Sequence, residues 1–138
     1  MLVKNRVILQ TVAALRRLDG NDKEHYKFSG LTSLTFARNL RRLGEALEEI
    51  EKQRRELVFK NKLGQNTDKD GNPAPDKPES VHTFQNEWTE VLEGETEIVI
   101  ALLKRGQLLL DTNSIPISIL AEIDWLLVPE EEAPAPGK

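Results

Sequence analysis

The stretch "TSLTFARNLRRLGEALEEIEKQRRELVFKNK", residues 32–62, decides the fold of this 138-residue chain. Its apolar residues recur at alternating steps of four and three, a heptad pattern typical of a helix with one apolar seam. No proline interrupts the run, and Thr32 is a suitable N-cap. The pattern therefore predicts one long helix over about 32–62. Its seam comprises Phe36, Leu40, Leu43, Leu47, Ile50, Arg54 and Leu57.

The predicted helix is too long to be covered easily by the rest of the chain. It extends about 46 Å at 1.5 Å per residue, whereas a compact chain of this size has a radius of gyration of about 14 Å. Monomers rarely expose apolar stripes, so the overhanging part is predicted to bind a second copy or a protein partner. The part of the seam predicted to make this contact comprises Leu43, Leu47, Ile50, Arg54 and Leu57. The alternative is that the seam belongs to the chain's own core.

Two small residues lie beside the seam. Ala37 and Gly44 are seven residues apart and leave room for a close neighbour. A glycine inside a helix costs about 1 kcal/mol relative to alanine, so Gly44 favours a packing role.

The remaining elements are short. Helical spacing predicts a first helix over 4–18, a third helix capped by Thr83, and a last helix with Pro116 in its first turn. The β-branched run at 96–103 predicts a strand, for which Leu31 or Tyr26–Phe28 are the expected partners.

These elements predict a mainly α fold of the α+β class, built on one long helix with a small β element. Residues 1–129 are expected to form a single helical domain. Within it, residues 63–82 form a flexible segment rich in proline and glycine. Residues 130–138 are expected to be a disordered acidic tail.

The composition argues against catalysis. The chain has no cysteine, which excludes disulfides, thiolate nucleophiles and cysteine-bound zinc. It has two histidines, both in polar connectors, and no nucleophile-elbow serine motif. We therefore expect no enzyme, no cofactor and no metal. The start of the chain lacks a cleavable leader and is too short to span a bilayer, which predicts a cytoplasmic location.

The charge is unevenly distributed along the chain. Residues 1–42 contain nine Lys/Arg and three acids, a net charge of +6, whereas residues 43–138 contain ten and twenty, a net charge of −10. Such polarity favours attraction between the two parts, or between two copies head to tail. The overall net charge of −4 argues against general nucleic-acid binding, which requires a basic surface.

A basic cluster near the start of the long helix is the main candidate ligand site. Guanidinium groups beside an amide and an aromatic ring suit phosphate or nucleotide recognition. The candidate residues are Tyr26, Lys27, Arg38, Asn39, Arg41 and Arg42. The alternative is solvated surface, with Arg41 paired to Glu45 four residues later.

The segment "NTDKDGNPAPDKPES", residues 66–80, places four residues at positions of a calcium-binding loop. The twelfth position, which requires a glutamate, is Lys77, and the eighth is Pro73. Asp-Gly-Asn also favours a tight turn. The segment is therefore predicted to be a turn and not a metal site.

The order of these features resembles a family of small tailed-phage and prophage proteins of unknown function. The likeness spans about residues 5–128 and includes Ala37-Arg38-Asn39, the Asp-Gly-Asn turn, the Glu-rich strand and the helix around Ile123-Asp124-Trp125. The chain departs from the family in its longer, proline-rich turn segment and its acidic tail. The resemblance implies a phage gene product in the bacterial cytoplasm, and it implies no catalytic residue.

The sequence and the resemblance are compatible with three functions. The first is a non-enzymatic phage accessory protein, a homo-oligomer that binds a host or phage protein such as a defence-system component. The second is a sponge that sequesters a nucleotide signal with the basic cluster. The third is a structural role in virion assembly.

Overall fold

The fold is seen in a computed structural model, which describes residues 1–18 and 26–128. The predicted acidic tail lies outside these residues. The elements, in chain order, are β1 (Leu2–Lys4), α1 (Asn5–Leu18), α2 (Gly30–Lys60), α3 (Pro78–Glu93), β2 (Glu95–Glu97), the 3-10 helix η1 (Arg105–Leu108), α4 (Ile117–Ile123) and the 3-10 helix η2 (Asp124–Leu126). The fold is mainly helical with a small β element, as the sequence predicted.

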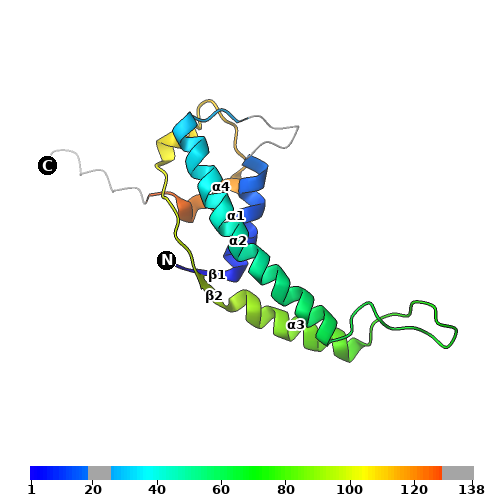
Figure 1. The fold of residues 1–138 in the computed structure, drawn as a ribbon. Helices are drawn as coiled ribbons and strands as arrows, with labels where there is room; N and C mark the ends of the chain where they lie inside the picture. The colour runs from blue at the N-terminus through cyan, green and yellow to red at the C-terminus, as the bar shows by residue number, and fades with distance from the viewer. Residues whose placement is uncertain (19–25, 129–138) are drawn as a thin grey trace, which may run out of the picture.

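The long helix α2 is the spine of the molecule (Figure 1). α1 packs along its first half, α4 packs against α1, and α3 lies along the second half of α2. The core forms where α1, α2 and the C-terminal segment meet. Its fully buried members include Ile8, Leu43, Ile50, Ile119 and Ile123.

The start of α2 differs slightly from the prediction. The N-cap is Ser29, whose hydroxyl accepts a hydrogen bond from the Thr32 N–H at 3.2 Å. Thr32, the predicted cap, is instead buried within the first turn. The helix therefore begins at Gly30 and ends at Lys60. Both its start and its end lie two residues earlier in the chain than the predicted positions, 32 and 62.

The third helix begins five residues before the predicted cap, Thr83. Pro78 occupies its first turn, where the missing N–H of proline costs no helical hydrogen bond. The extra turn lengthens α3 to 16 residues. It is thus long enough to cover the second half of α2.

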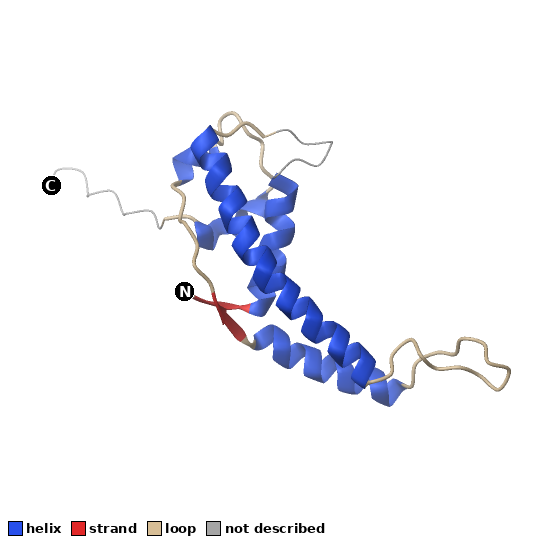
Figure 2. Ribbon diagram, viewed as in Figure 1, coloured by secondary structure: helices blue, strands red, loops and turns tan. Residues whose placement is uncertain are grey.

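The sheet is smaller than predicted and has a different partner strand. β2 covers Glu95–Glu97 and pairs antiparallel with β1, with Val3 opposite Thr96. The partner is therefore the N-terminal strand, and neither Leu31 nor Tyr26–Phe28 (Figure 2). Residues 98–104 continue in an extended path without belonging to a strand, apart from an isolated bridge between Leu103 and Leu127.

Three buried asparagines tie distant segments together through both ends of their amides. Asn5 donates to the Val91 carbonyl and accepts from the Thr96 hydroxyl. Asn39 and Asn113 each pair with the backbone N–H and C=O of one remote residue, Ala101 and Lys27 respectively. A buried amide with both ends satisfied holds a loop in one register.

Candidate functional site

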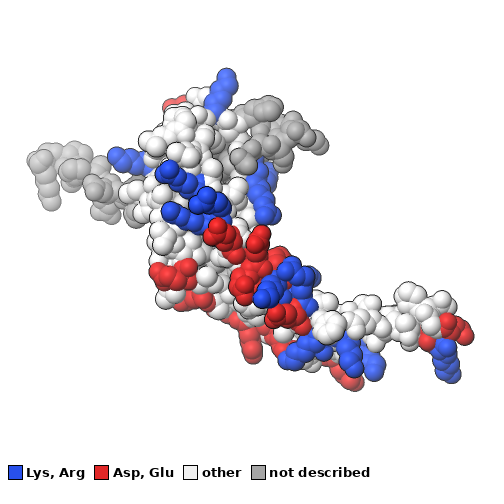
Figure 3. All heavy atoms as spheres, in the orientation of Figure 1, with Lys and Arg blue, Asp and Glu red and all other residues white. Residues whose placement is uncertain are grey.

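The three arginines of the predicted cluster are exposed on the first half of α2. Figure 3 shows basic side chains gathered over this part of the molecule. Arg42 donates a hydrogen bond to the Val99 carbonyl at 3.2 Å. Arg38 and Arg41 form no hydrogen bond or ion pair with any described residue, so the alternative pairing of Arg41 with Glu45 is not observed.

Asn39 does not belong to this exposed surface. Its side chain is 0% exposed, its Nδ2 donates to the Ala101 carbonyl at 2.8 Å, and its Oδ1 accepts from the Ala101 N–H at 2.9 Å. Both the donor and the acceptor of the amide are therefore bonded to the backbone of Ala101. Its role is therefore structural, in place of the ligand contact that the sequence predicted.

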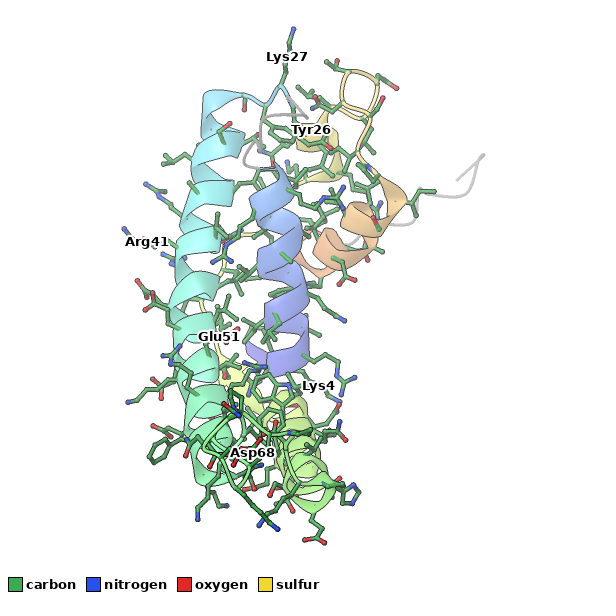
Figure 4. All side chains as sticks on the ribbon, turned by 90° about the vertical axis from the view of Figure 1, so that its right-hand side faces the viewer. Lys4, Tyr26, Lys27, Arg41, Glu51 and Asp68 are labelled. Atoms are coloured by element: carbon green, nitrogen blue, oxygen red, sulfur yellow. The ribbon has the colours of Figure 1, made fainter. Side chains whose placement is uncertain are left out.

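Lys27 and Tyr26 lie at the end of the molecule where α2 begins, whereas Arg41 lies farther along the helix (Figure 4). Arg41 is about 16 Å from the start of α2 at 1.5 Å per residue. The Tyr26 ring stacks on Phe28, with ring centroids 6.3 Å apart. The six predicted ligand residues are thus distributed over separate places and do not line one pocket.

The predicted partner seam is packed inside the chain. Leu43 and Ile50 are fully buried, and Leu47 and Leu57 are half-buried. Arg54, the polar member of the seam, lies over the Phe84 ring of α3 at 5.9 Å from its centroid. α3 therefore covers the overhang for which a second copy was expected.

The segment after α2 forms the turn that the sequence predicted. The Asp68 carboxylate accepts hydrogen bonds from the N–H groups of Asp70 and Asn72, both at 2.9 Å. Gly71 adopts a φ of 79°, which glycine reaches without steric cost. Across the described ranges 1–18 and 26–128, no group of three or more His, Cys, Asp or Glu side chains could hold a metal ion.

A different surface is exposed and apolar. We call it the apolar edge; it comprises Met1, Leu102 and Val128, which are 39–54% exposed. Met1, Leu102 and Val128 line a hollow of about 280 Å³, together with Trp125, Leu127 and the ion-paired Arg105 and Asp124. Apolar groups that remain exposed together often mark an interaction surface.

The backbone beside the apolar edge has unused hydrogen-bonding groups. The Ile98 N–H donates to the Met1 carbonyl, and the Ile98 carbonyl accepts from the Met1 ammonium; these are the last bonds to the N-terminal segment. Beyond them, Ala101 bonds to Asn39 and Leu103 bonds to the segment 126–128. Between these points, the N–H groups of Val99, Ile100 and Leu102 have no partner among the described residues. An unpaired extended edge is a template for another strand.

The sequence pattern did not predict a functional role for this edge. The apolar run 96–103 was predicted to be a paired strand, and its β-branched residues gave no sign that the pairing stops at Ile98.

No helix in the described part of the chain combines the length and the apolar character that crossing a membrane requires. A search of protein-family models, of curated proteins and of solved structures finds no match to this chain.

Proposed function

We propose that this chain is a non-enzymatic accessory protein that acts by binding another protein. The observation that carries the proposal is the set of N–H groups of Val99, Ile100 and Leu102 that have no partner among the described residues and lie beside the apolar edge. Together they provide main-chain donors and acceptors for affinity and apolar contacts for selectivity. Strand addition to an open edge uses this combination.

The partner is expected to present an extended apolar segment. Such a segment would continue the line of β1 past Met1 and pair with the backbone of Ile100 and Leu102. Its apolar side chains would fill the hollow between Met1, Leu102 and Val128. Burial of this apolar surface supplies the driving force for association.

The biological setting is inferred from the resemblance to small phage and prophage proteins. We propose that the partner is a bacterial or phage protein, with components of host defence systems as leading candidates. The resemblance rests on the order of elements and on short motifs. The nucleotide-sponge alternative lacks the support of a common pocket, because the candidate residues do not converge.

The test is affinity capture from bacteria infected with a tailed phage, with the wild-type chain and two variants as bait. Leu102→Asp places a charge on the apolar edge. Leu110→Asp is a matched control, because Leu110 is 46% exposed and Leu102 is 45% exposed, but Leu110 lies outside the edge.

We expect the captured partner to be lost with Leu102→Asp and retained with Leu110→Asp. Amide hydrogen exchange of the purified complex should then show new protection at Ile100 and Leu102, whose N–H groups face the same side as that of Ile98. A partner that binds both variants equally, without new protection at these amides, would contradict the proposed surface.

A further inference from the structure

The outward face of α2 carries opposite charges in separate blocks. Arg38 and Arg41 precede Gly44, and Glu45 and Glu48 follow it. All four charged side chains are exposed, and none forms an ion pair or hydrogen bond with a described residue. Figure 3 shows the same change from basic to acidic along the helix. The face thus carries an ordered charge pattern that the described chain does not use.

Gly44 lies at the boundary between the two blocks and has open space above it. A Cβ added there would meet no atom within 4 Å. Gly44 also lines a surface hollow of about 780 Å³ together with Arg41, Glu48 and Arg16 of α1. The close neighbour that the sequence predicted at Gly44 is therefore not supplied by the described residues.

We propose that a second copy of this chain docks on this face, with the two α2 helices antiparallel and crossing near Gly44. A two-fold axis between residues 44 and 45 places Arg41 of each copy opposite Glu48 of the other. Each contact occurs twice because a two-fold interface is self-complementary.

Charge selects this register over its alternatives. A parallel arrangement in register places Arg41 opposite Arg41 and Glu48 opposite Glu48, so like charges meet. An antiparallel arrangement centred on Glu48 places Arg41 opposite Arg55. In the register centred on Gly44, opposite charges face each other, and glycine allows the two backbones a close approach.

This inference goes beyond the proposed function and uses none of the residues of the apolar edge. A dimer formed in this way would carry two copies of that edge. Its ion pairs are exposed to solvent, so the association is expected to weaken as the salt concentration rises.

The test is sedimentation equilibrium of two charge-reversal variants, alone and mixed. In Arg41→Glu alone, and in Glu48→Arg alone, both symmetric pairs become repulsive, so the dimer dissociation constant should rise more than about tenfold. In an equimolar mixture of the two variants, every 41–48 pair is again opposite in charge. We expect the mixture to form a heterodimer, and the double variant Arg41→Glu/Glu48→Arg to form a homodimer.

The outcomes are decisive in both directions. A wild-type chain that stays monomeric at high concentration and low salt overturns the proposal. It is also overturned if either single variant dimerises like the wild type, or if the mixture stays monomeric. Both positions are exposed, so circular dichroism should show each variant folded. Leu102→Asp should still form the dimer. The absence of a dimer can therefore be distinguished from the absence of partner binding at the apolar edge.

A cysteine cross-link tests the register independently. The chain contains no cysteine, so a single introduced thiol reports only contacts between copies. Gly44→Cys should form a disulfide rapidly under mild oxidation, because a disulfide requires Cα atoms within about 7 Å. Asp111→Cys is the control, because Asp111 is exposed and does not belong to α2. Equal cross-linking of both variants would contradict a crossing point at Gly44.

Discussion

The two halves of α2 are stabilised in different ways. The first half packs against α1, which has seven buried residues, and contributes fully buried side chains of its own such as Leu43. The second half packs against α3, in which no residue falls in the buried class. One continuous helix therefore belongs to a close-packed body at one end and to a partly solvated helical pair at the other.

Polar contacts follow the same division. In the body, Asn39 is fully buried and bonds to the backbone of Ala101. In the α2–α3 pair, the polar contacts lie near the surface, as in the ion pair between Lys60 and Glu87 at 2.6 Å. Exposed pairs contribute little to stability. The α2–α3 pair is therefore expected to open at a lower free energy than the body.

The largest expected difference between the two halves of α2 is in the loss of unfolding free energy when a seam leucine is replaced by alanine. Leu43 and Leu57 lie in the same seam, two heptads apart. Leu43→Ala should lower the free energy of unfolding by about 3 kcal/mol, because it leaves a cavity in a closed core. Leu57→Ala should lower it by about 1 kcal/mol, because the side chain is half-buried and its site can fill with water. Urea unfolding of both variants measures the two values. Equal losses would show that the two halves are packed alike.

A smaller effect is expected at the buried amide of the body. Asn39→Leu should lower the free energy of unfolding by about 2–3 kcal/mol, since it leaves the N–H and C=O of Ala101 unpaired. The neighbouring exposed substitution Arg38→Leu should change it by less than about 0.5 kcal/mol. Chemical denaturation distinguishes the two. An Asn39→Leu variant of unchanged stability would contradict the structural role of Asn39.

The sequence was sufficient for the long helix, because a heptad pattern without proline over about thirty residues has few other solutions. It was also sufficient for the turn around Asp68 and Gly71, where local chemistry dominates. The extent of α3 was underestimated, because Thr83 looked like a cap and Pro78 looked like a loop residue. The cap therefore lies six residues earlier than predicted, at Lys77, and the shorter predicted helix made the overhang of α2 appear uncovered.

The roles of polar residues were harder to predict. Arg38 and Asn39 are adjacent in the sequence, yet one is exposed and the other is fully buried. A helix turns 100° per residue, so the direction of each side chain depends on where the neighbouring helices lie. The backbone segment that Asn39 holds is 62 residues away. No local pattern identifies such a pairing.

The contact between Arg54 and Phe84 is expected to contribute modestly to the α2–α3 pair. Arg54→Met keeps an apolar stem and removes the charge over the ring, which should lower the free energy of unfolding by about 0.5 kcal/mol. Arg55→Met, the exposed neighbour, is the control. Amide exchange in α3 should quicken only in the first variant; the same exchange rates in both would assign the contact no stabilising role.

The smallest effect is expected for the acid dependence of stability, because the ion pairs involved lie near the surface. The hydrogen bond from Lys60, followed by that from Asn61, lowers the pKa of Glu87 from its ordinary value of 4.5. The hydrogen bond from Lys4 and the charge of Arg6 lower the pKa of Glu93 in the same direction. Glu87 ties α3 to the end of α2, and Glu93 ties it to β1 and α1.

Because the pKa of both carboxyls is lower in the folded chain, their stabilisation is present above about pH 4.5 and is lost as the pH falls through the folded pKa. Thermal unfolding between pH 7 and pH 3 should therefore show a smaller decrease in Tm for Glu87→Gln/Glu93→Gln than for the wild type. Glu90→Gln, on the same helix and without an ion pair to a described residue, should behave like the wild type. If all three chains lose the same Tm in acid, the attachment of α3 does not depend on these carboxylates, and its half-buried apolar face alone holds it to α2.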